Sequence, residues 1–94
     1  MALFMLACFD KPHVLDLRMA TREAHLAYVR EQAAVVKVAG PMLDEAEGMA
    51  GSLFILEADD RAAVQAFNAG DPYQQAGVFG QVEIRGFRAS IGQL

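Results

Sequence analysis

Two apolar stretches decide the fold: ALFMLACF at residues 2–9 and SLFILEA at residues 52–58. The first ends at Asp10, Lys11 and Pro12, and its length and this ending favour a strand. Successive side chains of a strand point to opposite faces, and here both faces of each stretch carry large apolar residues. We therefore expect two strands that are buried on both sides.

Helix and turn signals surround these strands. Residues 10–20 are typical of a polar loop with a short turn at 15–19, and Thr21 is a plausible N-cap for a helix over about 22–38. The apolar stripe of this helix is Leu26, Val29, Ala33 and Val36, and Gly40-Pro41 ends it. The remaining expected elements are a short edge strand at 41–44, a loop at 45–50, a helix at 61–69 that Gly70 stops, a short helical turn from Asp71-Pro72, and a last strand at 79–89.

The elements follow the order β-α-β-β-α-β, which predicts a single α+β domain over residues 1–94 with a ferredoxin-like fold. Two helices can cover one face of a four-stranded sheet, and the chain has no element left for the other face. Exposed apolar patches beyond about a few hundred Å² are rare on monomers. The apolar second faces of strands 2–9 and 52–58 therefore predict a homodimer packed sheet to sheet.

Composition narrows the function classes. The net charge is −4 and the eight Lys and Arg are scattered, which argues against nucleic acid or an anionic membrane surface as a partner. The single cysteine, Cys8, lies in an apolar run and excludes an internal disulfide. Residues 1–9 lack a positive region and a cleavage site, and no segment approaches the ~20 apolar residues of a membrane span. We expect a cytoplasmic protein.

His25 is the first candidate for chemistry. On the helical wheel it borders the apolar stripe, and Arg22, one turn earlier, falls in line with that stripe. In a helix that begins near Arg22, both residues lie at the positive end of the macrodipole, which favours a neutral imidazole that can act as a base. The alternative is a histidine satisfied at the core edge and an arginine paired with a carboxylate.

Asp71, Tyr73 and Ser52 are further candidates. Asp71 precedes Pro72, and capping of a helical turn alone explains this pair, although a carboxylate that orients a histidine has the same signature. Tyr73 is either a donor to a ligand or a half-buried ring, and Ser52 either offers a hydroxyl or merely begins a strand. The first and last strands of such a sheet are neighbours, so we expect His25 and Asp71 to meet at a cleft, through a hydrogen bond or one bridging water.

Several short motifs, taken together and in order, resemble the YCII-related family over nearly the whole chain. The most specific is Asp71-Pro72-Tyr73 followed by Ala76-Gly77-Val78-Phe79. The others are a polar loop after the first strand, two arginines and a histidine, a Gly-Pro, a Gly-Ser at a strand start and a Val-x-Ile strand: residues 9–12, Arg18, Arg22, His25, Gly40-Pro41, Gly51-Ser52 and Val82-Glu83-Ile84.

The resemblance implies a ferredoxin-like protomer that forms a dimeric α+β barrel. It also implies an active site with a histidine and an aspartate, which correspond to His25 and Asp71. A related dehydrochlorinase of chlorinated hydroxyhydroquinone, and the muconolactone isomerases that share the barrel, point to acid–base chemistry on small cyclic compounds. The short loop between Asp44 and Gly51 departs from some relatives, so the substrate does not carry over.

Two functions fit these residues. The first is a cofactor-free lyase or isomerase that moves a proton on a small anionic or cyclic molecule, with His25 as the base and Asp71 as its orienting partner. The second is a non-catalytic ligand-binding or accessory dimer that uses the same cleft. The histidines and acids have no metal-ligand spacing, so we expect neither a metal nor an organic cofactor. The expected substrate-binding residues are Arg18, Arg22, Ser52 and Tyr73.

Overall fold

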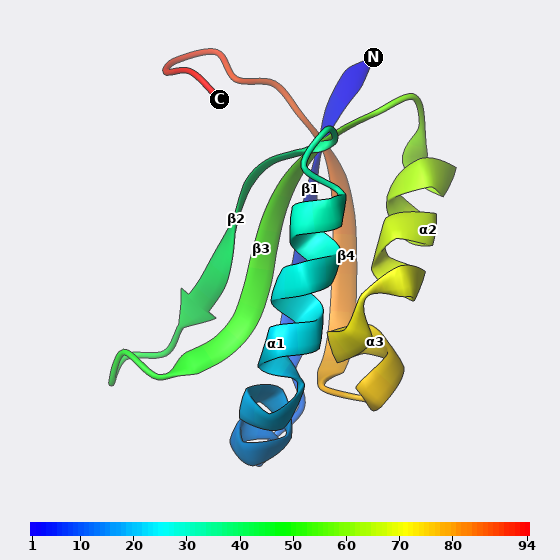
Figure 1. Ribbon diagram of the computed structural model, residues 1–94. Helices are drawn as coiled ribbons and strands as arrows, with labels where there is room; N and C mark the ends of the chain where they lie inside the picture. The colour runs from blue at the N-terminus through cyan, green and yellow to red at the C-terminus, as the bar shows by residue number, and fades with distance from the viewer.

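Four antiparallel strands form one sheet, and three helices lie on one of its faces (Figure 1). This computed structural model describes all 94 residues. The strands are β1 (Ala2–Asp10), β2 (Val36–Leu43), β3 (Met49–Ala58) and β4 (Phe79–Phe87), and the helices are α1 (Leu15–Glu31), α2 (Arg61–Gly70) and α3 (Pro72–Ala76). The strand order β2-β3-β1-β4 is the ferredoxin-like arrangement, so the predicted α+β fold is confirmed.

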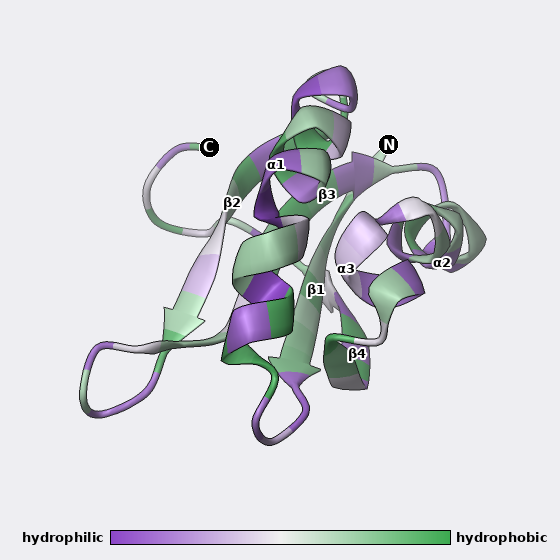
Figure 2. Cartoon of the chain, turned by 60° about the horizontal axis from the view of Figure 1, so that its bottom comes forward, coloured by the Kyte–Doolittle hydropathy of each residue, from purple (hydrophilic) through white to green (hydrophobic).

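The hydrophobic core lies between the sheet and the helices. Leu6 of β1 pairs with Phe54 of β3 on one side and with Ile84 of β4 on the other. These three side chains belong to one buried cluster with Val64 and Phe67 of α2. Figure 2 shows β1 coloured as hydrophobic along most of its length, in agreement with its central place in the sheet.

The start of the first helix differs from the prediction. α1 begins at Leu15 and not near Arg22, because residues 15–20 consist mostly of strong helix formers and extend the helix toward its N-terminus. Thr21 is not an N-cap. Its hydroxyl donates to the carbonyl oxygen of Leu17, one turn earlier in the same helix.

The predicted end of this helix is instead part of a strand. α1 ends at Glu31, and the segment from Val36 onward pairs with β3 as strand β2. Val36 and Val38 are β-branched and favour a strand, so their assignment to the helix was wrong. Pro41 lies inside β2, which is tolerated because this strand is at the edge of the sheet and has a neighbour on one side only.

Two smaller boundaries also move. β3 begins at Met49, within the segment expected to be a loop, and β4 ends at Phe87 and not at residue 89. Gly51 explains how β1 and β3 approach each other here. A Cβ atom at Gly51 would lie 2.5 Å from the carbonyl oxygen of Cys8, so any other residue would force the two strands apart.

Candidate active site

His25 lies near the middle of α1, on its buried side. The two buried residues of this helix are Arg18 and His25, which lie about two turns apart. Both are polar, although they lie on the buried side of the helix. The prediction that His25 occupies the first turns is wrong, because the helix begins at Leu15. The macrodipole acts mainly within the first turn, so the effect that was expected at His25 does not apply there.

Asp71 reaches His25 from the start of α3. Its Oδ1 lies 2.8 Å from Nδ1 of His25 and 2.9 Å from the backbone nitrogen of Tyr73. One carboxylate oxygen therefore caps α3 and contacts the histidine, so the two interpretations of its sequence signature are compatible. The other oxygen, Oδ2, is sealed in the protein without a hydrogen-bond partner.

The contact between His25 and Asp71 decides the imidazole tautomer. A carboxylate only accepts hydrogen bonds, so the proton of the neutral ring belongs on Nδ1 and the lone pair on Nε2. Nε2 has no partner in the protein and is not among the sealed polar atoms. Because His25 lines a pocket, this nitrogen is the atom available to a ligand.

Tyr73 fixes the plane of the imidazole. The Tyr73 and His25 rings stack with centroids 3.9 Å apart and an angle of 15° between their planes. The Arg18 guanidinium carbon lies 4.5 Å from the centre of the same tyrosine ring. Burial raises the pKa of Tyr73 and outweighs the opposing effect of the guanidinium groups of Arg18 and Arg22, so its phenol keeps its proton at neutral pH.

Arg18 is held inside the protein by side chains from two strands. Its Nε and Nη2 donate to the two carboxylate oxygens of Asp10 at 2.8 and 3.1 Å, and Nη2 also donates to the Ser52 hydroxyl at 2.8 Å. The Arg18 side chain is 2% exposed. Sequence reasoning missed Asp10 as a member of this cluster, although a carboxylate at the end of the first strand was its signal.

A pocket of about 140 Å³ opens between α1 and the β2–β3 half of the sheet. It brings together all the predicted site residues except Asp71, which stands behind His25. Its volume is close to the roughly 150 Å³ of an engineered cavity that holds a benzene molecule. The polar lining consists of Arg18, Arg22, His25, Ser52 and Tyr73, and the apolar lining includes Leu26, Val29, Pro41, Met49 and Phe54.

Arg22 differs from Arg18 because its guanidinium group is not paired with a carboxylate. It lines the pocket, is exposed to solvent and takes part in none of the ion pairs of the protein. The apolar lining, by contrast, could not be foreseen, because Pro41 and Met49 were expected at a strand start and in a loop. The pocket therefore combines a ring-sized space with one unpaired cation and one imidazole nitrogen.

Cys8 lies under the site and is not part of its lining. Its thiol is fully buried and donates to Oδ1 of Asn68 at 3.6 Å. Burial, with the nearby carboxylates of Asp71 and Asp10, raises the pKa of Cys8 to about 12. A thiol with this pKa is not a nucleophile at neutral pH, as expected for an inert buried cysteine.

No group of three or more His, Cys, Asp or Glu side chains is gathered where it could hold a metal ion. None of the helices is long and apolar enough to cross a membrane.

Comparison with known proteins decides the family. A sequence model of the YCII-related domain matches residues 2–88. The chain belongs to the YCII-related family. Protein YciI of Escherichia coli O6:H1 is 34% identical over 92% of this chain and 96% of its own length. An uncharacterised protein of Haemophilus influenzae is 33% identical over 84% of this chain and 89% of its own.

One solved structure that is similar to this chain is a complex of an enzyme with a small ring compound. It is 5-chloro-2-hydroxyhydroquinone dehydrochlorinase (TftG) from Burkholderia phenoliruptrix in complex with 2,5-dihydroxybenzoquinone. TftG is similar to this YCII-related chain with 32% identity and a TM-score of 0.84 over 92% of the chain and 93% of TftG. An antibiotic biosynthesis monooxygenase is 18% identical with a TM-score of 0.58 over 97% of the chain and 100% of its own, a likeness of fold alone.

Proposed function

We propose that this YCII-related protein is a cofactor-free lyase or isomerase that moves a proton on a small, single-ring, oxygen-bearing anion. The observation that carries the proposal is the 2.8 Å contact between Nδ1 of His25 and Oδ1 of Asp71, next to a pocket of about 140 Å³. This contact leaves Nε2 of His25 as the base. The ring-sized pocket volume limits the substrate to a compact molecule.

The proposed reaction begins with proton transfer to Nε2 of His25 from a carbon or oxygen of the ring. The electron pair left behind moves onto a conjugated carbonyl oxygen, which becomes an enolate or phenolate. The imidazolium then returns the proton at another position, which is an isomerisation, or the electron pair expels a leaving group, which is an elimination. Asp71 stabilises the imidazolium, and such acid–base help accounts for roughly 10²–10⁴ in rate.

Arg22 is the proposed partner of the developing oxyanion. It is the cation of the pocket without a carboxylate partner, whereas Arg18 already binds Asp10. The Ser52 hydroxyl accepts from Arg18 and so keeps its own O–H as a donor at the pocket wall, and Tyr73 supplies a protonated phenol. A charge-assisted hydrogen bond of this kind is worth about 1.5–3 kcal/mol.

The similarity to TftG supports the class of chemistry and of substrate. TftG is a dehydrochlorinase, and its bound 2,5-dihydroxybenzoquinone is a single ring with oxygen substituents. A compound of this kind matches the ring-sized volume of the pocket around His25. The similarity to TftG therefore supports a reaction type and a class of substrate, and not one particular compound.

A non-catalytic ligand-binding dimer is the second candidate. The observation that favours it is the tight enclosure of His25, which is 8% exposed and stacked on Tyr73. A histidine so enclosed also suits a structural role at the rim of a binding pocket. The two candidates differ in one measurable property, because only a base exchanges a proton with the bound molecule.

The deciding experiment follows single-ring compounds by ¹H NMR in D₂O, with 2,5-dihydroxybenzoquinone, its monohydroxy analogue and small unsaturated lactones as probes. The wild type should speed product formation or C–H to C–D exchange in at least one probe, and His25→Gln should lower this rate by about 100-fold or more. Glu23→Gln, an exposed change on the same helix, is the matched control and should keep the rate. Binding of a probe without any exchange would favour the second candidate.

We also propose that the protein acts as a homodimer through the face of the sheet opposite the helices. Large apolar side chains remain exposed there: Phe9 is 38%, Val38 45% and Phe87 43% exposed. The protomer buries only 17 of its 94 residues, a small core that a partner would enlarge. The apolar residues of this face are Leu3, Met5, Ala7, Phe9, Val38, Leu53, Ile55 and Phe87.

A cytoplasmic location and the absence of a cofactor stay predictions from the sequence.

A further inference from the structure

A second pocket lies near the C-terminal end of α1, between α1, α2 and the end of β3, and the proposed reaction does not use it. Its volume is about 460 Å³. Its floor consists of buried side chains, because Leu56 is 1%, Val64 0% and Phe67 7% exposed. Small-molecule sites typically measure about 300–1,000 Å³ and have mostly hydrophobic and aromatic walls.

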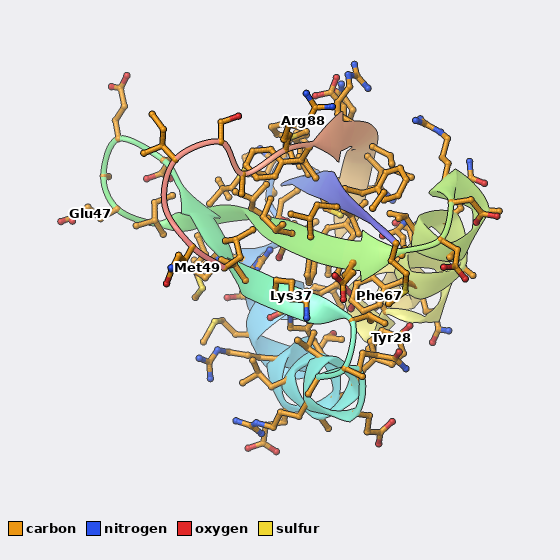
Figure 3. The ribbon with its side chains drawn as sticks, turned by 90° about the horizontal axis from the view of Figure 1, so that it is seen from above. Tyr28, Lys37, Glu47, Met49, Phe67 and Arg88 are labelled. Carbon is orange, nitrogen blue, oxygen red and sulfur yellow. The ribbon has the colours of Figure 1, made fainter.

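The wall between the two helices is fixed by Tyr28 and Phe67, which lie close together in Figure 3. The Tyr28 hydroxyl donates to the backbone carbonyl of Phe67 at 2.8 Å, and the two rings are 5.3 Å apart. Burial raises the pKa of Tyr28, so this donor is kept at neutral pH. A Cβ atom at Gly70 would lie 2.6 Å from the Tyr28 hydroxyl, so glycine at this position leaves room for the contact.

The pocket is separate from the His25 pocket. Phe54 lines the His25 side and Phe67 lines this side, and the two rings meet edge to face with centroids 5.3 Å apart. No residue lines both pockets. A ligand in one pocket can therefore be distinguished from a ligand in the other by the residues that it perturbs.

The charges at this pocket are acidic. Its charged side chains are the carboxylates of Glu57 and Asp59, and neither lysine nor arginine lines it. Glu57 is paired with Lys37 at 3.4 Å, whereas Asp59 takes part in no ion pair. The α-amino group of Met1 is the one other charge, and it belongs to a residue that is 85% exposed and so is well solvated.

We propose that this second pocket binds a small organic amine, with its apolar body on Leu56, Val64 and Phe67 and its ammonium group beside Asp59. The apolar floor supplies most of the binding, and the free carboxylate at the rim selects the charge of the ligand. The proposal does not rest on His25 and stands whether or not the chain is an enzyme.

The test is titration of ¹⁵N-labelled protein with two probes of the same ring and opposite charge, 2-phenylethylamine and 3-phenylpropionate. The amine should shift the backbone amide signals of Tyr28, Val64 and Phe67 in a saturable way, and it should bind at least fivefold more tightly than the acid. Equal affinity for the two probes would overturn the charge selection. Shifts centred on His25 and Arg22, or no saturable shift for either probe, would overturn the site.

Two variants sharpen the test. Asp59→Asn should weaken the amine at least threefold and leave the acid unchanged, while Asp16→Asn, an exposed acid of the first turn of α1, is the control that should change neither. Ala66→Trp places a large ring in the pocket from an exposed position of α2 and should abolish binding of the amine. Unchanged amine affinity in Asp59→Asn or in Ala66→Trp would contradict the proposal.

Discussion

His25 and Asp71 lie 46 positions apart in the chain and meet through a 2.8 Å contact between Nδ1 and Oδ1. The same carboxylate oxygen accepts the backbone N–H of Tyr73, whose ring stacks on the imidazole at 3.9 Å. The histidine is therefore held by its edge and by its face. This arrangement leaves Nε2 as its one free polar atom.

Asp71→Asn should separate orientation from capping. Asparagine caps a helix about as well as aspartate, so the free energy of unfolding should change by about 1 kcal/mol or less. The uncharged amide no longer stabilises an imidazolium or one tautomer, so turnover of a responsive probe should fall about 100-fold or more. Paired thermal-unfolding and rate measurements give both quantities.

The matched control for this prediction is Asp60→Asn. Asp60 is the N-cap of α2 and accepts the backbone N–H of Ala63 at 2.9 Å, but it contacts no histidine. Its substitution should have a similar small effect on stability and none on the rate. If Asp71→Asn loses stability and rate to the same degree, Asp71 is only a cap.

Substitution of Arg18 should mainly lower stability, whereas substitution of Arg22 should mainly weaken ligand binding. Arg18→Met leaves the Asp10 carboxylate, 7% exposed, without its partner and should lower the free energy of unfolding by about 3–5 kcal/mol. Arg22→Gln removes an exposed, unpaired charge and should change it by about 0.5 kcal/mol or less. Binding of an anionic ring should weaken about tenfold or more in Arg22→Gln. Denaturant unfolding and ligand titration measure the two effects, and strong destabilisation by Arg22→Gln would refute this division of roles.

Cys8 should not react with thiol reagents in the folded protein. Its pKa of about 12 and its full burial predict negligible labelling of the native protein at pH 8 and rapid labelling after unfolding. The raised pKa also predicts that stability falls as pH rises above 9.0, because the unfolded thiol then loses a proton that the folded thiol keeps. Cys8→Ala should lessen this alkaline loss. Fast labelling of the folded protein would show that the thiol is reachable.

The helix-free face of the sheet should hold two copies together. Sedimentation should give about twice 10.2 kDa for the wild type. Val38→Asp places a charge on this face and should produce monomers, while Met19→Asp, at a residue 49% exposed on α1, should not. A wild-type monomer at micromolar concentration would contradict the proposed homodimer.

Much of the fold could be predicted from two patterns. The double-sided apolar runs at 2–9 and 52–58 form the paired central strands β1 and β3. One face of these strands packs on the helices, and the other keeps apolar residues such as Phe9, which is 38% exposed. The helix over 22–38 was predicted too long because Val36 lies in register with the apolar stripe of the helix, although Val36 and Val38 also suit a strand. Only the pairing with β3, a contact distant in sequence, decides between these two.

The residues of the candidate site were easier to predict from the sequence than their contacts. The proximity of His25 and Asp71 followed from the neighbouring first and last strands, and the structure places them in contact. The difference between Arg18 and Arg22 could not be predicted, because it depends on Asp10 and Ser52, which come from two different strands. The volume of the pocket likewise depends on how far α1 stands from the sheet.

The most direct test of the His25–Asp71 account is the imidazole tautomer, measured by ¹⁵N–¹H correlation NMR of the histidine rings. In the neutral ring of the wild type, His25 should carry its proton on Nδ1 and leave Nε2 unprotonated, because the Asp71 carboxylate can only accept. In Asp71→Asn this preference should weaken or be lost. A wild-type signal from the Nε2–H tautomer would contradict the account, because the nitrogen facing the pocket could then not act as a base.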